Sequence, residues 1–226
     1  MRKHLLAAAA VTLSVSAAPA SAAIVIGTAN PPATFVKINN PVGLTNVGNN
    51  TSQNNGLNVR NVYGFDEKQK VTLLAPLAAH LAPGGATNAG AGIIAAGTQV
   101  ASHYLFFDPV RTTAAVSTIT FNRKVIGIVR TTAGLAATDA LLGIAGVGYT
   151  NVPGRGLEEG NSVTFAINGN TVTLDTRSAT PGDSFRVLTA AVPEPATWAM
   201  MILGFGLIGG ALRQAKGRTT TRVRFA

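Results

Sequence analysis

Alternating apolar and polar residues on both sides of an Asn-Gly pair constrain this chain toward a β-rich fold more than any other feature. The segment over residues 161–176 reads NSVTFAINGNTVTLDT, and its alternating apolar positions are Val163, Phe165, Ile167, Val172 and Leu174. Asn-Gly between two such runs is the strongest short-range signal for an antiparallel hairpin. We therefore expect two paired strands that turn at Asn168-Gly169.

Other short runs of β-branched and aromatic residues indicate further strands, separated by turns rich in Gly, Pro and Asn. These runs cover residues 71–74, 99–107, 116–121, 125–131 and 184–192. Only residues 135–145 favour a helical turn, with Thr138 as its cap. Residues 39–58, rich in Asn and Gly, are expected to form a long surface loop. The fold class that follows is mainly β, with a single antiparallel β-sandwich over residues 23–190.

The net charge of +9 belongs mainly to the two ends of the 226-residue chain. Residues 23–192 hold 11 Lys and Arg against 8 Asp and Glu, whereas five positive residues follow position 212. The body has no basic stripe interleaved with aromatic residues, so we expect no nucleic-acid partner. The absence of cysteine excludes disulfide bonds and Cys-ligated zinc.

Residues 1–22 have the parts of a secretory signal peptide. Arg2 and Lys3 precede an apolar run over residues 5–15, and Ala20-Ser21-Ala22 supplies the small residues that signal peptidase reads. We expect signal peptidase to cleave after Ala22. A retained membrane helix is the alternative, but the 11 residues of the apolar run are too few to cross a hydrocarbon core of about 30 Å.

The C-terminal residues predict a tether followed by a membrane segment. Pro193-Glu194-Pro195 lies in an extended tether over residues 191–195, because each proline disfavours helix in the residue before it. Residues 196–212 carry no charge, have Trp198 near their start, and lead into a basic tail over residues 213–226. This order predicts one transmembrane helix in the inner membrane, with the body outside and the tail in the cytoplasm.

Pro-Glu-Pro, then Trp198-Ala199-Met200, an apolar helix and a basic tail together resemble the PEP-CTERM sorting signal in its P-E-P-x-x-W-A-M form. The resemblance implies an exported protein of Gram-negative bacteria that is transiently anchored in the inner membrane, facing the periplasm. It also implies that an exosortase recognises the sorting motif, Pro193, Glu194, Pro195 and Trp198. Removal of the tail and delivery to the cell surface or the extracellular matrix are then expected to follow. The tail is longer and less densely basic than is usual in that family.

The body resembles a recurring ectodomain of PEP-CTERM proteins, for which no activity is established. The stretches that carry this second resemblance are residues 61–73, 97–109, 134–143, 155–163 and 180–189. It therefore adds no catalytic or binding residues to those that the sequence itself indicates.

None of the common catalytic motifs is present: neither G-x-S-x-G, nor H-E-x-x-H, nor a phosphate loop, nor a dinucleotide-binding glycine run. We therefore expect no enzyme. His103 is interpreted as an ordinary sheet residue, and the adjacent Glu158 and Glu159 would point to opposite faces of a strand. Carboxylates from several turns can supply the oxygen ligands of Ca²⁺. On that basis Asp66, Glu67 and Asp108 are candidate calcium ligands, with ordinary turn chemistry as the alternative.

Three function classes remain open. The first is a noncatalytic surface or matrix protein whose partners are signal peptidase, the exosortase and the inner membrane. The second is a lectin-like module that binds extracellular polysaccharide, provided that Tyr63, Tyr104 and Tyr149 are exposed and can stack on sugar rings. The third is a polysaccharide-active enzyme, which requires two carboxylates at glycosidase separation in an exposed groove.

Overall fold

The computed structural model describes residues 21–81, 91–157, 164–179, 181–192 and 195–216. The chain divides into a compact body, Ser21–Val192, and a second unit to which the C-terminal helix belongs. Most of the expected signal peptide, Glu158, Glu159, Pro193 and Glu194 lie outside the described residues.

The body is mainly β, as predicted. Its strands are β1 (Ile24–Ala29), β2 (Phe35–Lys37), β3 (Val62–Asp66), β4 (Val71–Thr72), β5 (Leu77–His80), β6 (Ala91–Ile94), β7 (Gln99–Phe107), β8 (Thr113–Phe121), β9 (Val125–Val129), β10 (Thr164–Asn168), β11 (Thr171–Ser178) and β12 (Asp183–Ala190). Its helices are α1 (Thr51–Asn54) and α2 (Thr132–Leu142).

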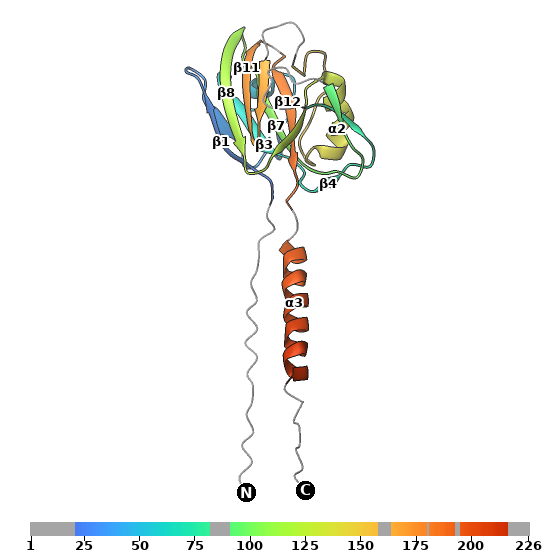
Figure 1. Cartoon of the computed structure of the whole chain (residues 1–226). Helices are drawn as coiled ribbons and strands as arrows, with labels where there is room; N and C mark the ends of the chain where they lie inside the picture. The colour runs from blue at the N-terminus through green and yellow to red at the C-terminus, as the bar shows by residue number, and fades with distance from the viewer. Residues whose placement is uncertain (1–20, 82–90, 158–163, 180, 193–194, 217–226) are drawn as a thin grey trace, which may run out of the picture. The chain divides into compact units, whose positions relative to one another are not determined.

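Two sheets form the β-sandwich (Figure 1). The smaller sheet has the strand order β1-β8-β11-β10, and the larger has the order β2-β3-β7-β12-β9-β5-β6, with β4 also paired to β7. The pairings between described strands are antiparallel except for β2 with β3, which is parallel. The predicted sandwich is therefore confirmed, but it is not purely antiparallel.

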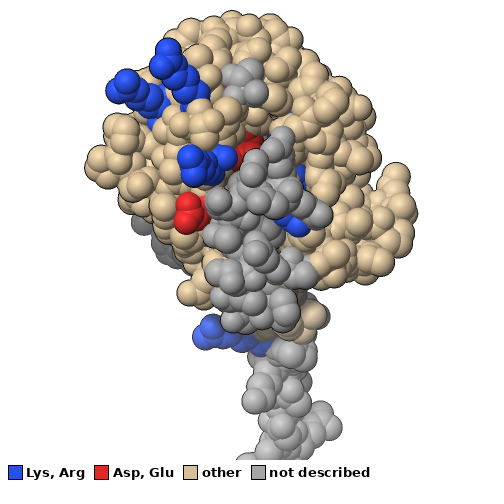
Figure 2. Space-filling model, turned by 90° about the horizontal axis from the view of Figure 1, so that it is seen from above, with Lys and Arg blue, Asp and Glu red and all other residues tan. Residues whose placement is uncertain are grey.

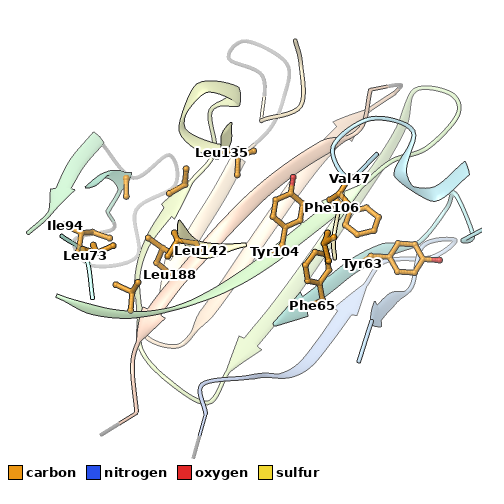
Figure 3. Packing of buried hydrophobic residues seen from close by; sticks show 14 residues of the cluster. Val47, Tyr63, Phe65, Leu73, Ile94, Tyr104, Phe106, Leu135, Leu142 and Leu188 are labelled. Atoms are coloured by element: carbon orange, nitrogen blue, oxygen red, sulfur yellow. The ribbon is translucent and has the colours of Figure 1, made fainter. Parts of the chain in front are cut away.

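The larger sheet is buried on both of its faces, which explains why β7 and β12 are buried along nearly their whole length. Because successive strand residues point to opposite faces, Leu105, Phe185 and Val187 pack against the smaller sheet. Tyr104, Phe106 and Leu188 point the other way, into a second apolar cluster that includes Leu135 and Leu142 of α2. Figure 3 shows this second cluster, with aromatic rings from β3 and β7 side by side.

The predicted hairpin is confirmed, with a shift of one residue in its turn. Phe165 pairs with Leu174 and Asn168 pairs with Thr171, so the turn is made by Gly169 and Asn170 rather than by Asn168-Gly169. Gly169 has φ of 62°, a left-handed conformation that glycine adopts at little cost.

The helix and the Asn-rich loop differ from prediction. Thr131, not Thr138, caps α2 by accepting the Gly134 N–H at 3.1 Å, whereas Thr138 lies inside the helix and donates to the Gly134 carbonyl. Residues 39–58 are not simply a surface loop, because Val47 and Ser52 are completely buried. The loop and α2 cover the same face of the larger sheet, so they form a third layer that period-two patterning cannot reveal.

The second unit contains α3 (Pro195–Lys216), a helix of 22 residues. The apolar side chains described in it are exposed, and they are Met201, Ile202, Leu203, Phe205, Leu207 and Ile208. Among the residues that the structure describes, no helix combines the length and the apolar character that crossing a membrane requires. The transmembrane helix predicted over residues 196–212 is therefore present as a helix but is not confirmed as a membrane span.

Candidate functional site

A fully buried arginine, Arg186 of β12, is at the centre of the most polar part of the body. Its Nε donates to Glu67 Oε2 at 2.5 Å and its Nη2 donates to Glu67 Oε1 at 2.8 Å, a two-point pairing of guanidinium and carboxylate. Both side chains are 0% exposed. Ser102 and Tyr149 also donate hydroxyl hydrogens to Glu67, each at 2.6 Å. Every oxygen of this carboxylate is therefore occupied by donors of the protein itself.

A second buried arginine, Arg155, extends the network to α2. Two of its nitrogens donate to the two oxygens of Asp139, at 2.6 and 2.9 Å, and its Nε donates to the Tyr104 hydroxyl at 2.9 Å. Asp139 also accepts from Arg186 Nη2 at 3.0 Å. The two arginines and two carboxylates balance in charge, and Glu67 and Asp139 each face an arginine at two points.

Electrostatics keeps the two guanidinium groups protonated. Burial alone would lower the pKa of Arg186, but Glu67 outweighs that effect and raises it. Burial alone would likewise lower the pKa of Arg155, but the hydrogen bonds that it donates to Asp139 outweigh that effect and raise the pKa. Burial raises the pKa of Tyr149, and the neighbouring Glu67 raises it further. Both guanidinium groups and the Tyr149 hydroxyl are thus held in their protonated forms, and the mutual pairing of these side chains suits a structural lock.

A hollow of about 450 Å³ opens beside this network, between α2 and the loop over residues 143–149. The charged and hydroxyl groups that line it are Lys68, Asp139 and Tyr149. Lys68 Nζ donates to the Ala140 and Leu141 carbonyls at 2.9 and 3.3 Å, which caps the C-terminal end of α2. Since Asp139 and Tyr149 are bonded within the network, the polar groups of the hollow already have protein partners.

The opposite face of the larger sheet holds a chain of hydroxyl, imidazole and carboxylate groups. His103 Nδ1 lies 2.7 Å from Asp66 Oδ1, and His103 Nε2 lies 3.0 Å from Thr189 Oγ1. These residue types also occur in catalytic triads, but His103 and Thr189 are both 0% exposed. No substrate reaches the hydroxyl, so His103 is a sheet residue, as the sequence indicated.

Asp66 links this chain of groups to the start of the body. It accepts the Ile24 N–H at 2.9 Å and pairs with Lys37 Nζ at 2.7 Å. Burial alone would raise the pKa of Asp66, but the hydrogen bonds from His103 and Lys37 outweigh it and lower the pKa. Asp66 is therefore an ionised anchor that fixes β1 against the larger sheet.

The structure does not bring the three candidate calcium ligands together. Asp66 is the last residue of β3 and Glu67 follows it, and the two serve opposite faces of the larger sheet, the first with Lys37 and the second with Arg186. Asp108 is 1% exposed and accepts the Ser52 N–H at 3.0 Å, where it holds the start of α1. Within the described residues, no group of three or more His, Asp or Glu side chains is placed to hold a metal ion.

The tyrosines proposed as a sugar platform do not form one. Tyr63 and Tyr104 are 4% and 0% exposed. Tyr149 is half-buried, and the guanidinium groups of Arg155 and Arg186 lie 5.6 and 5.7 Å from the centre of its ring. Tyr63 and Tyr104 therefore belong to the interior, and Tyr149 lies against the two arginines beside the hollow, so the three rings form no common stacking surface.

The described surface that is visible in Figure 2 carries few charges. Figure 2 shows a few Lys and Arg side chains, and fewer Asp and Glu, on an otherwise uncharged described surface. This distribution agrees with the small net charge of residues 23–192 that the sequence shows.

Sequence reasoning missed the two buried arginines. Arg186 was visible as the one charged residue inside the apolar run SFRVLTAAV over residues 184–192. A charge in a strand buried on both faces requires a partner, but nothing in the sequence identifies Glu67, which precedes it by 119 residues. Arg155 lies in an irregular segment and gave no comparable signal.

Comparison with known families adds a function to the C-terminal segment alone. The model of the PEP-CTERM protein-sorting motif matches residues 191–216, which include Pro193-Glu194-Pro195, Trp198 and α3. Neither a curated protein nor a solved structure matches the chain. The chain therefore carries a C-terminal PEP-CTERM protein-sorting motif, which marks it as an exported protein that an exosortase sorts.

Proposed function

We propose that the body is a noncatalytic surface or extracellular-matrix module, delivered by its sorting motif and freed from the C-terminal segment by the exosortase. The observation that carries this proposal is the match of residues 191–216 to the sorting motif. The body is then the part that reaches the destination, and its internal bonding suits a module that has to persist outside the cell.

The commitment of the carboxylates supports a noncatalytic role. Glu67 and Asp139 are paired with buried arginines, Asp66 is paired with Lys37, and Asp108 and Asp183 are almost completely buried. A glycosidase needs two carboxyl groups that face each other across a substrate. Asp175 is the only exposed carboxylate among the described residues. Those residues therefore contain no pair of exposed carboxyl groups that could face each other across a substrate.

The exposed apolar side chains of α3 support a transient anchoring step at the inner membrane. Residues 195–212 carry no charge, and Arg213 begins the basic tail. Transfer of these solvent-exposed apolar side chains into lipid lowers the free energy of the system. The basic residues that follow them are expected to remain on the cytoplasmic side. Anchoring in transit is thus part of the proposed route.

A second candidate function, binding of extracellular polysaccharide, is favoured by the outer face of the smaller sheet. Two pairs of threonine hydroxyls lie across β8 and β11, Thr118 with Thr173 at 3.3 Å and Thr120 with Thr171 at 3.2 Å. Each pair uses one hydroxyl hydrogen internally and keeps a second for a ligand. The double variant Thr171→Val and Thr173→Val should then weaken co-sedimentation with the host's polysaccharide, whereas Thr112→Val, in an exposed turn, should not.

The test of the sorting proposal is the intact mass and location of the mature protein, with and without the host's exosortase. We expect a chain that ends near residues 193–195 only when the enzyme is present. Replacing Pro193-Glu194-Pro195 by three alanines should leave the tail attached even with the enzyme, while the same change at Thr219-Thr220-Thr221, outside the matched segment, should not. A chain that retains its tail in both strains would refute processing at the motif.

A further inference from the structure

The N-terminal residues of the body belong to its fold from Ser21 onward. Asn122, in the turn between β8 and β9, donates from Nδ2 to the Ser21 carbonyl at 3.0 Å and accepts the Ala23 N–H on Oδ1 at 2.8 Å. The Asn122 N–H also donates to the Ala23 carbonyl at 3.0 Å. One asparagine therefore holds the chain on both sides of Ala22.

Ala22 itself fills a buried space where the start and the end of the body meet. It is 2% exposed and forms an apolar cluster with Ala101 of β7 and with Val192, which are 1% and 5% exposed. Val192 is the last residue before Pro-Glu-Pro. The segments that enter β1 and leave β12 lie at one end of the sandwich (Figure 1).

Two Ala-x-Ala sequences close to the start of the body can direct signal peptidase. They are Ala20-Ser21-Ala22, which directs a cut after Ala22, and Ala18-Pro19-Ala20, which directs a cut after Ala20. The sequence pattern does not separate them, because both present alanine at the two positions that the enzyme reads.

The structure does separate them, because the two cuts leave different bodies. A cut after Ala22 removes the side chain that fills the space beside Ala101 and Val192, and it removes the carbonyl that Asn122 Nδ2 binds. A cut after Ala20 retains all these contacts. A residue discarded before folding has no part in the folded state, so a buried Ala22 held from both sides belongs to the retained chain.

We propose that the mature chain begins at Ser21, and that Ala22 stays in place as the contact between the N-terminus and the base of the Pro-Glu-Pro tether. This inference rests on the proposed export through a signal peptide. Its consequence is that Val192, the last residue of the body, remains packed beside the new N-terminus.

The test is the mass of the N-terminal peptide of the full chain, exported by its host and denatured directly after a short labelling pulse. We expect the wild-type peptide to begin at Ser21. Ala18→Asp blocks only the cut after Ala20, so the peptide that begins at Ser21 should be lost. The matched control Ala22→Leu blocks only the cut after Ala22, so the Ser21 start should remain. Reading the peptide under denaturing conditions makes the result independent of whether the Ala22→Leu body folds.

The alternative outcomes separate this inference from the proposed function. A wild-type peptide that begins at Ala23 overturns the inference, as does a Ser21 start that is insensitive to Ala18→Asp, and either result leaves export and sorting intact. A chain that still carries Met1 overturns the inference together with the export signal.

Discussion

Along β7 and β12, successive residues alternate between a face covered by the smaller sheet and a face covered by α2. On the first face Leu105 and Phe185 contribute to an apolar core in which His103, Thr189 and Asp66 form one short polar chain. On the second face Tyr104 and Arg186, directly opposite each other in the strand register, belong to a network of two ion-paired arginines. The two faces are equally buried but are stabilised by different interactions.

The two faces differ in how precisely their interactions fix the position of the layer that covers them. Apolar side chains tolerate many relative placements of two sheets, because dispersion and burial have no direction. The bonds of Arg186 to Glu67 and Thr138 are directional, and they fix α2 against β3 and β12. Arg155 adds bonds between its own loop and Asp139 of α2. We infer that the charged face sets where the third layer sits, whereas the first face holds the smaller sheet through the burial of apolar side chains.

The largest effect is expected from Arg186→Met, which leaves the buried Glu67 carboxylate without its cation. Removing one partner of a buried ion pair lowers the free energy of unfolding by about 3–5 kcal/mol. Adding Glu67→Leu should recover part of that loss, because the uncompensated charge is gone. Urea denaturation of the purified protein, followed by circular dichroism, measures all three free energies.

The matched control is Leu105→Ala on the other face, which creates a cavity and lowers stability by about 2–5 kcal/mol. Unfolding of this variant should remain cooperative and two-state. Because Leu105→Ala leaves no unpaired charge, no second substitution comparable to Glu67→Leu should restore its stability. If Arg186→Met were no worse than a surface substitution, the network would not hold α2, and the contrast between the faces would fail.

The sequence predicted those features of the body that depend on residues close together in the chain, and it did not predict those that depend on residues far apart. The β10–β11 hairpin and β7 were predicted because period-two alternation and turn residues are local signals. The network was not, since Glu67 and Arg186 meet only after β3, β7 and β12 are assembled. The same reason applies to the calcium candidates Asp66, Glu67 and Asp108. Their expected turn positions suggested one shared rim, but in the assembled body Asp66 and Glu67 serve opposite faces of the larger sheet.

The second prediction concerns Asp66, the carboxylate that the first face pairs with His103. Because its pKa in the folded state is lowered from the ordinary value of 3.8, its contribution to stability is complete above that value and is lost as pH falls through the folded-state pKa. In the Asp66→Asn variant, the free energy of unfolding should therefore fall less steeply than in the wild type as the pH is lowered. At neutral pH the loss should be about 1 kcal/mol, because the pair with Lys37 is partly exposed.

Asp108 supplies the control of opposite sign. Burial raises its pKa, so protonation in the folded state adds stability as pH falls through that raised value. Asp108→Asn should remove this gain, in contrast to Asp66→Asn. Melting temperatures measured from pH 3 to pH 7, a range spanning the carboxylate values, compare the two. Equal acid limbs in both variants would contradict the assignment of Asp66 as an ionised anchor.

An effect no larger than that of Asp66→Asn is expected at the beginning of α2, where Thr131→Ala removes the cap on the Gly134 N–H. Loss of an N-cap hydroxyl lowers stability by about 1 kcal/mol, and Thr131→Ser, which keeps the oxygen, should lower it less. The effect stays small because two other contacts hold α2. Arg186 donates a hydrogen bond to Thr138 within the helix, and Lys68 donates to a carbonyl near its C-terminal end. Hydrogen exchange should then increase only in the first turn of α2. If exchange increased along the whole helix, α2 would be held by its N-cap rather than by the charged face. The arginine network would then not determine the position of α2.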